Sequence, residues 1–560
     1  MSSTLYRGGA VLAPAVLAAT SLLVADGTIV WVGGDDEADG LAPAADTVVD
    51  LHGALVTPGF VDAHAHVLLT GLRREGVDLS GATDLADALA RLGRASRGPE
   101  AHRLAADGAP LTGAGWDEQS WPERRAPTRT ELDAACGGAP VLLDRAGGGQ
   151  GVVSTSFAQV LGLPALDGWR EDGLVQGTAF ATARAAVLDV DPTRRGRLVG
   201  RALAELAGAG VVALHEMSAP ETDSRDGLAE LMAATADPVS ALPLVVGYRA
   251  ELCETTDDAR AILAALPGLT GIGGHLGVDG SLGARTAALR APYAELPAGS
   301  ARSAGSVRPA GELALNAEQV SNHVAAVTRA GVQAGFRVSG DRAMDEVLLG
   351  FRAASDVEGV DALRRAGHRL EHVTMLDAPA LATTVLLGLT CSVQPAFDAA
   401  LGGESGRYAQ QLGPGRAASL LPLADLLAAG IPLAFGSGTP TTPLDPWVGV
   451  QAAVRHRTPD QRVGVRAAVT AATRGGWLAA GLGADGAGEL RVGAPAHLAI
   501  WAVDDGEQPT DGALPGSRPD WRAYGVQQRD AVLPSLPDDA PLPRCLRTVR
   551  AGVVLHDTLG

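Results

Sequence analysis

The stretch Pro58-Gly59-Phe60-Val61-Asp62-Ala63-His64-Ala65-His66 carries the strongest structural and chemical signal in the chain. It consists of a Pro-Gly turn, a short apolar run and two histidines two positions apart. Side chains two positions apart in a β-strand point to the same side, so His64 and His66 project together, as two ligands of one metal ion must. The apolar residues predict a buried strand with polar groups at its end. The alternative is a pair of histidines that binds no ion.

The composition limits both the fold and the partners. A chain of 560 residues, 46% hydrophobic and 19% charged, can bury a large core and suits a barrel with insertions and a side domain. Its net charge of −19 and pI near 5.0 argue against a nucleic-acid or membrane partner, because such surfaces attract clustered cations. All 45 basic residues are arginine, which excludes a carbamylated lysine as a metal bridge.

Cysteine usage and hydropathy indicate a cytoplasmic protein. The four cysteines, at positions 136, 253, 391 and 545, are far apart and form no C-x-x-C pair, as expected of reduced thiols. The apolar run 10–25 contains Pro14 and leads into a turn and a strand, so we interpret it as short strands and not as an export signal. No stretch approaches the ~20 uninterrupted apolar residues of a membrane span.

Both ends of the chain consist of short β segments. Residues 1–56 hold several of them between Gly and Asp turns, and residues 479–560 hold an apolar strand at 496–503 and a further piece at 546–555. Neither group can bury both of its faces alone, so we predict that the two ends form one small β-sandwich. The Pro- and Asp-rich segment 509–539 is interpreted as a surface excursion.

Residues 57–478 alternate apolar strands with Ala- and Leu-rich helices. This pattern predicts an α/β fold, specifically a (β/α)8 TIM-like barrel. Residues from about 70 to 190 carry too few such units and are expected to form an insertion. The strand candidates end in polar residues, which lie at the catalytic face of such a barrel; they are 210–215, 271–279, 333–339, 368–372, 390–394 and 432–437.

Motifs along nearly the whole chain resemble the amidohydrolase superfamily, and specifically amidohydrolase family 3, the branch that includes N-substituted formamide deformylase. The resemblance implies a metal-dependent hydrolase barrel with a small β-sandwich that acts on non-peptide carbon–nitrogen bonds of small molecules. The matching motifs are PGFVDAHAH at 58–66, GWDEQSWPERRAPTRTELDAA at 115–135, DGSLGARTAAL at 279–289, SGDRAMD at 339–345, HRLEH at 368–372, SVQP at 392–395, LAFGS at 433–437 and PLDPWVGVQAAV at 443–454.

In that family the H-x-H pair, a carbamylated lysine and two later strand-end histidines bind the metal, and an aspartate on the last strand is both ligand and general base. His64 and His66 match the pair, and His372 matches the second later histidine. The resemblance therefore implies that these three residues are metal ligands.

The other site positions depart from the family pattern. His275 stands in place of the lysine, Arg337 in place of the first later histidine and Gly438 in place of the aspartate. Two further positions at the mouth of the barrel also differ, with Gly147–Gly149 where the family has Asp-Gly-His, and Phe397 where it has a histidine.

These substitutions change the expected chemistry. Gly438 can neither hold an ion nor accept a proton, and the permanent charge of Arg337 opposes a cation. A family-type binuclear site is therefore not expected. One ion on His64, His66 and His372, with His275 as a further ligand, remains compatible with neutral imidazoles. The alternative for His275 is a hydrogen-bonded core histidine.

The remaining site predictions concern acids and the substrate. Asp341 and Glu371 are nominated as substitute catalytic bases, with a role in holding loop geometry as the alternative. Arg337 is predicted to bind a substrate carboxylate, or else to pair with one of those acids. Trp116 and His215 are predicted to line the substrate pocket, with simple packing as the alternative for each.

Two functional hypotheses follow. The first is a hydrolase of carbon–nitrogen bonds with one divalent metal, zinc or else iron or manganese. The second is a catalytically degenerate barrel, without metal, that binds a small molecule such as an acid through Arg337. The substitutions fall at the metal-binding and catalytic positions and leave the other motifs intact, which favours the second hypothesis. Members of the superfamily work with different ligand sets, which favours the first. The expected partner is a small molecule, with no nucleic acid and no membrane. The sequence leaves two further alternatives undecided, namely a homodimer and a partner subunit that supplies the missing groups.

Overall fold

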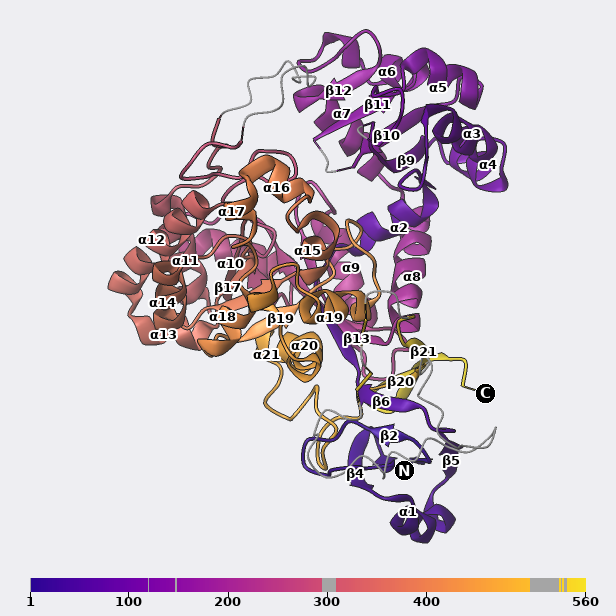
Figure 1. The fold of residues 1–560 in the computed structure, drawn as a ribbon, viewed down its shortest axis with the longest axis vertical. Helices are drawn as coiled ribbons and strands as arrows, with labels where there is room; N and C mark the ends of the chain where they lie inside the picture. Colours follow the sequence, from indigo (N-terminus) through magenta and orange to yellow (C-terminus); the bar gives the residue numbers. More distant parts are fainter. Residues whose placement is uncertain are drawn as a thin grey trace.

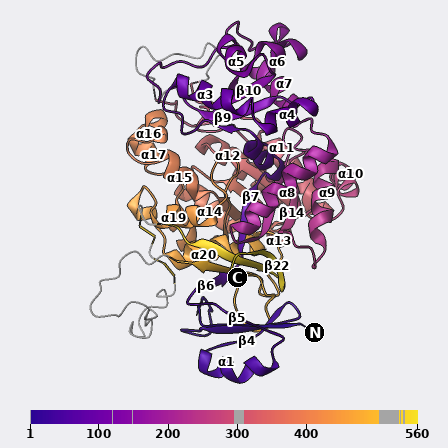
Figure 2. The same cartoon turned by 90° about the vertical axis from the view of Figure 1, so that its right-hand side faces the viewer.

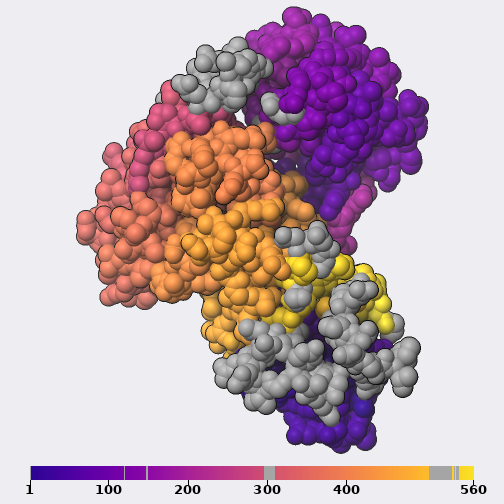
Figure 3. Space-filling view, in the orientation of Figure 1, coloured from indigo at the N-terminus to yellow at the C-terminus, as the bar shows by residue number. Residues whose placement is uncertain are grey.

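The computed structural model describes residues 2–118, 120–146, 149–294, 309–503, 533–534, 536–537 and 541–559. A barrel occupies the middle of the molecule (Figure 1). The segment inserted after its first strand forms a lobe at one end, and strands from both chain ends form a lobe at the other, as the space-filling view also shows (Figures 2 and 3). The predicted fold class is confirmed.

The barrel is one eight-stranded parallel sheet whose strand order follows the chain. It nearly closes on itself, because Ala65 and Thr439 form a parallel bridge and the amide of Gly438 donates to the carbonyl of His64 at 2.8 Å. The strands are β7 (Phe60–Ala65), β13 (Val211–Ser218), β14 (Leu244–Arg249), β15 (Gly271–Ile272), β16 (Gln333–Val338), β17 (Arg369–His372), β18 (Thr390–Val393) and β19 (Leu433–Phe435).

Helices between and after these strands cover the barrel, and the buried faces of most of them join its main core. They are α8 (Pro192–Gly208), α9 (Arg225–Ala236), α10 (Thr256–Ala265), α11 (Ala317–Ala330), α12 (Asp341–Glu358), α13 (Val360–Ala366), α14 (Ala378–Leu387), α15 (Pro395–Leu401), α16 (Arg407–Leu412), α17 (Pro414–Ala417), α18 (Leu423–Ala428), α19 (Pro446–Val454), α20 (Val465–Ala472) and α21 (Arg474–Ala479). None of the helices in the described ranges is long and apolar enough to cross a membrane.

Two strands differ from the sequence-based expectation. The predicted strand 271–279 ends at Ile272, because Gly273 and Gly274 adopt φ values of 128° and 75° that leave the extended region. His275 therefore lies in the loop after β15. Strand β14 was not among the expected strands, although it is buried over five of its six residues.

The inserted segment builds its own five-stranded sheet, in the order β12-β11-β10-β9-β8. Its core includes Trp116 and Trp121, whose ring centroids are 6.1 Å apart. The elements are α2 (Val67–Glu75), which leads from the barrel, β8 (Val77–Asp78), α3 (Leu85–Ala95), α4 (Pro99–Ala106), β9 (Leu111–Trp116), α5 (Arg129–Cys136), β10 (Val141–Arg145), β11 (Gln150–Val153), α6 (Thr155–Val160), β12 (Leu174–Gln176) and α7 (Gly177–Leu188).

Both chain ends contribute strands to the second lobe, as predicted. One sheet has the order β4-β3-β1-β5 and the other the order β2-β6-β20-β21-β22, and a shared apolar core lies between them. The predicted excursion at 509–539 lies outside the described residues, except for residues 533, 534, 536 and 537. The elements are β1 (Ser3–Arg7), β2 (Ala10–Val11), β3 (Ser21–Ala25), β4 (Thr28–Gly33), α1 (Asp35–Leu41), β5 (Thr47–Asp50), β6 (Leu55–Pro58), β20 (Leu498–Ala502), β21 (Arg544–Arg550) and β22 (Val553–Asp557).

Three aromatic rings join the barrel to the sandwich. Phe60 of β7, Trp447 of α19 and Trp501 of β20 meet edge to face, with centroids 5.4 to 5.5 Å apart. The indole of Trp501 also donates to Thr57 Oγ1 at 2.9 Å. Edge-to-face pairs of this kind stabilise the fold by more than the burial of their apolar surface alone.

We expect Trp501→Ala to lower the free energy of unfolding by about 3–5 kcal/mol, because it leaves a cavity among three buried rings. Denaturant unfolding followed by circular dichroism measures this loss. Val160→Ala, at a side chain that is 79% exposed, is the control and should change the stability little. A small effect of Trp501→Ala would mean that the aromatic junction contributes little to folding.

Two histidines of the barrel wall are buried as neutral, fully hydrogen-bonded groups. His323 Nδ1 accepts from the amide of Cys253 at 3.0 Å, and its Nε2 donates to the carbonyl of Ile272 at 3.0 Å. Burial lowers the pKa of His323 to about 4 and that of His368 to about 3. Because the unfolded chain takes up protons near pH 6.5 and the folded chain does not, stability is lost as the pH falls below that value.

Between pH 7 and pH 5 we expect His323 alone to account for about 2 kcal/mol of lost unfolding free energy. Denaturant unfolding of wild type and His323→Gln at both pH values measures this term, which should disappear in the variant. Phe336→Leu removes a ring whose centroid lies 5.3 Å from that of His323, and it should lower stability equally at both pH values. An unchanged pH dependence in His323→Gln contradicts the prediction.

Candidate metal centre

Four histidines gather at the carboxyl ends of the barrel strands. His64 belongs to β7, His66 precedes the first turn of α2, His275 follows β15 and His372 ends β17. The ring centroid of His64 lies 5.4 Å from that of His66, 5.8 Å from that of His275 and 5.1 Å from that of His372, and the rings of His66 and His275 are 4.7 Å apart. The fold thus brings together all four histidines that the sequence nominated.

Three of these imidazoles fit one divalent ion. His64, His66 and His275 each offer a nitrogen, and these atoms lie within 4.8 Å of one another. The Nδ1 atoms of His66 and His275 are buried and have no hydrogen-bond partner in the part of the chain that the structure describes. Three imidazoles with an open fourth position are a known ligand set for catalytic zinc. His275 thus completes the group with the H-x-H pair, whereas His372, the third ligand expected from the resemblance, lies beside His64 outside it.

The local environment keeps these rings in the neutral form that binds metals. Burial lowers the pKa of His66 to about 3, and the neighbouring His64 and the guanidinium of Arg337 act in the same direction. Burial, again with neighbouring imidazoles and Arg337, holds the pKa values of His275 and His372 well below their ordinary value. Neutral imidazoles can offer a lone pair to an ion without first losing a proton.

The backbone at His372 is strained. Its φ is 68°, in the left-handed region that a residue with a Cβ rarely adopts, and Val373 follows with a φ of 46°. Such strain is found at functional sites, where the surrounding structure holds a side chain in place. Here it turns the chain at the end of β17, where His372 packs between the rings of His64 and Phe397.

Glu371 orients His64. Its Oε2 accepts a hydrogen bond from His64 Nδ1 at 2.8 Å, and its Oε1 accepts from Arg369 Nε. Burial opposes ionisation of Glu371, but Arg369 and His64 outweigh that effect and hold its pKa below the ordinary value. The hydrogen bond places the His64 proton on Nδ1 and leaves Nε2 free for an ion. The prediction that Glu371 is a catalytic base is therefore corrected, since both of its oxygens are engaged and the residue positions His64.

Arg369 extends this network through the barrel interior. It donates to His215 Nδ1 at 2.8 Å and to the carbonyl of Ala63 at 2.9 Å, and its guanidinium carbon lies 4.6 Å from the ring centroid of Tyr248. His215 is fully buried against this group. The prediction that His215 lines the substrate pocket is therefore corrected to a packing role.

The other two nominated residues also serve structure. Asp341 Oδ1 accepts from the amides of Arg290 and Arg342 at the start of α12, so the acid holds a loop, which was the alternative considered for it. Trp116 is fully buried in the core of the inserted lobe, which was the alternative considered for it, and its prediction as a pocket residue is corrected.

Arg337 is fixed next to the histidines. Its NH1 and NH2 groups donate to the carbonyls of Gly280 and Asp279 at 3.2 and 2.8 Å, while its buried Nε has no partner. Within the described residues no carboxylate forms an ion pair with it. Arg337 therefore adds positive charge beside the cluster, and its Nε bonds no group among the described residues.

A side chain at the position of the family aspartate would be strained. Gly438 has a φ of 68°, and a Cβ there would lie 3.1 Å from the ring of Phe397. Its amide instead donates to the carbonyl of His64. The two departures from the family pattern, Gly438 and Phe397, are thus in contact and fit one another.

Two buried acids near the cluster are not among the nominated site residues, although Glu216 follows His215 at a strand end that the sequence predicts. Asp62 accepts from the amides of His64 and Ser437 at 3.1 and 2.8 Å, which joins β7 to the loop after β19. Glu216 Oε2 accepts from the amide of Val67 at 2.7 Å, and burial raises its pKa to about 8. A carboxyl group inside an apolar strand is costly unless it is paired, and that cost is the sequence signal that indicates both.

Comparison with known proteins agrees with this architecture. A model of amidohydrolase family 3, described as "Amidohydrolase family", matches residues 47–556. The putative amidohydrolase YtcJ of Bacillus subtilis is 24% identical over 427 residues, 74% of this chain and 76% of YtcJ. The N-substituted formamide deformylase of Arthrobacter pascens is 31% identical over 148 residues, 26% of each chain.

A solved structure shares the fold. The crystal structure of an uncharacterized metal-dependent hydrolase from Pyrococcus horikoshii superimposes with a TM-score of 0.70 at 23% identity, over 90% of this chain and 98% of the other. With the family model matching most of its length, this chain belongs to the amidohydrolase family, family 3.

Proposed function

We propose that this protein is a hydrolase of carbon–nitrogen bonds other than peptide bonds, acting on a small molecule with one divalent metal ion. The observation that carries the proposal is the group of three imidazoles, His64, His66 and His275, whose nitrogen atoms lie within 4.8 Å of one another. Family membership and the likeness to an N-substituted formamide deformylase support the type of bond.

Each residue of the site then has a defined task. His64, His66 and His275 would hold a divalent ion, which would supply polarisation of a carbonyl and a lower pKa of water, the chemistry that hydrolysis of an amide-like bond requires. Glu371 keeps His64 in the tautomer with a free Nε2. Arg337 offers its Nε–H to an anionic group of the substrate, while backbone carbonyls anchor its NH1 and NH2 groups.

A second function is favoured by specific observations. Gly438 has no side chain where the family has its general base, and Arg337 is a fixed charge where the family has a ligand. Both changes suit a barrel that binds a small acid without hydrolysing it. The metal content of the protein separates the two proposals.

We expect purified wild-type protein, dialysed without chelator, to hold close to one equivalent of zinc, iron or manganese by elemental mass spectrometry. His64→Ala and His275→Ala should each lose the ion, because two imidazoles hold a divalent ion poorly. Glu371→Gln should lower metal affinity about 10- to 100-fold by releasing the orientation of His64.

The control for this experiment is His102→Ala, an exposed histidine on α4, which should retain the ion. Substoichiometric metal that His64→Ala does not change would favour the metal-free binding barrel. Loss of metal in His372→Ala but not in His275→Ala would instead reassign the third ligand.

Removing the charge of Arg337 should strengthen metal binding. We expect Arg337→Gln to raise zinc affinity about tenfold, since it removes a Coulomb repulsion of roughly 1–2 kcal/mol at an effective dielectric constant near 20. Competition with a chromophoric chelator measures the change. Arg342→Gln, an exposed arginine nearby in sequence, should have no effect. An affinity unchanged in Arg337→Gln would mean that its charge does not act on the ion.

A further inference from the structure

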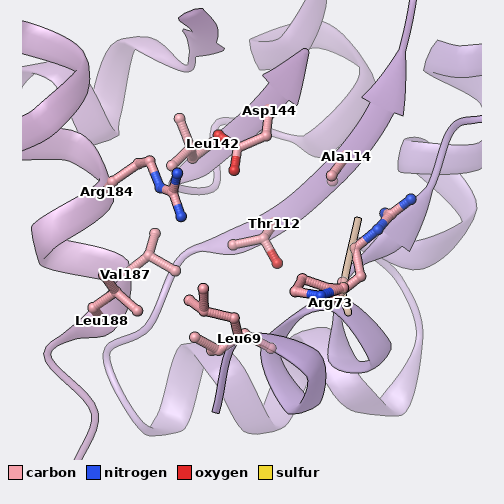
Figure 4. Close-up of a pocket in the computed structure, with 13 residues that line it drawn as sticks. Leu69, Arg73, Thr112, Ala114, Leu142, Asp144, Arg184, Val187 and Leu188 are labelled. Atoms are coloured by element: carbon pink, nitrogen blue, oxygen red, sulfur yellow. The ribbon is translucent and has the colours of Figure 1, made fainter. Parts of the chain in front are cut away.

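A small pocket lies where the inserted lobe meets the barrel (Figure 4). Its volume is about 100 Å³. The apolar part of its wall comes from α2 through Leu69, from β10 through Leu142 and from α7 through Val187 and Leu188. The pocket therefore exists only because three elements of the inserted segment fold against the end of the barrel.

Two charged side chains from the inserted lobe line this pocket, and the guanidinium carbon of Arg184 lies 5.9 Å from the ring centroid of Phe180. Asp144 of β10 and Arg184 of α7 point toward one another across it (Figure 4), and the ion pairs of the described residues do not include this one. Asp144 Oδ1 is buried and accepts no hydrogen bond. Burial raises the pKa of Asp144, although Arg184 and Arg73 act against this effect. Arg73, by contrast, is paired with Asp78 at 2.7 Å and so is already satisfied.

The pocket adjoins the histidine cluster. Leu69 lies three residues after His66 on α2, and Pro440, which also lines the pocket, lies two residues after Gly438. The charge of Arg184 is close enough to contribute to the lowered pKa of His66. The pocket thus shares α2 and the loop after β19 with the histidine cluster.

We propose that this pocket is a substrate subsite for a branched aliphatic group that carries an uncharged hydrogen-bond donor, the N–H of a carboxamide, which pairs with Asp144. The inference rests on the proposed function, in which the substrate binds at the histidines. It adds the chemical class of the end of the substrate that lies away from them.

Size and charge select this class of group. At about 100 Å³ the pocket is smaller than an apolar cavity of ~150 Å³ that binds benzene, so it admits only a small group. An unpaired buried carboxyl oxygen costs free energy, and a donor from the ligand recovers it. A cationic donor would meet the guanidinium of Arg184, whereas an amide can give its N–H to Asp144 and its carbonyl oxygen to Arg184.

The test uses isovaleramide, whose isobutyl group and carboxamide match these features, in ligand-observed saturation-transfer NMR with the full chain. We expect a saturable Kd in the millimolar range, as is usual for a ligand of this size. Asp144→Ala should weaken it about tenfold, the effect of one buried hydrogen bond. Val187→Trp, which fills the pocket, should abolish binding.

Matched variants control for fold and location. Asp189→Ala and Ala185→Trp change exposed positions next to the same wall and should bind isovaleramide as wild type does. Isovalerate and isoamylamine, which keep the same aliphatic body, should bind more weakly than the amide. The melting temperature of each variant shows whether it is folded. If Val187→Trp does not fold, the result for Asp144→Ala decides the test.

The titration is repeated on chelator-treated protein and on His64→Ala. Binding there should equal that of the metal-loaded wild type, so a failure of the metal proposal does not affect this result. Equal affinity in wild type and Asp144→Ala, unchanged binding in Val187→Trp, or tighter binding of isoamylamine would each overturn the assignment. An absence of any saturable binding of isovaleramide would do the same.

Discussion

The site depends on a buried chain of contacts from Arg369 through Glu371 to His64. Neither Arg369 nor Glu371 is exposed, and each charge is tolerated only because the other is adjacent and further hydrogen bonds satisfy the remaining atoms. This series of contacts links β17 to β7 and, through His215, to β13. Replacement of Arg369 or Glu371 by an uncharged residue would leave the charge of the other uncompensated in the barrel interior. The orientation of the first histidine is thus tied to the stability of the barrel itself.

The mouth of the barrel differs in charge from the rest of the molecule. The chain carries a net charge of −19, yet the guanidinium groups of Arg337 and Arg184 both act on His66. Neither forms an ion pair with a carboxylate among the described residues. Positive potential in a pocket of an acidic protein attracts anionic small molecules and repels cations. The same field that suits an acidic substrate weakens a divalent ion, and the neutral imidazoles must offset that effect.

The short helix α2 joins the two candidate binding regions. It begins directly after His66, its first amide is held by Glu216, and Leu69 in its first turn lines the pocket below the inserted lobe. A shift of this helix would move a metal-ligand candidate and a pocket wall together. The inserted lobe is therefore more than an appendage of the barrel, because its strand β10 and helix α7 supply the charged residues of that pocket.

Local patterns determined the barrel, the composite sandwich and the position of His64 and His66, because strand periodicity and turn residues act over a few neighbours. They also indicated that Arg337 and Gly438 depart from the family's chemistry. Only the tertiary structure decided that His275 joins the pair, that Glu371 and His215 are interior partners, that Trp116 is core, and that Asp144 faces Arg184. Those outcomes depend on which strand ends meet and on which side chains are buried together, and such contacts between distant segments leave no periodic trace in the sequence.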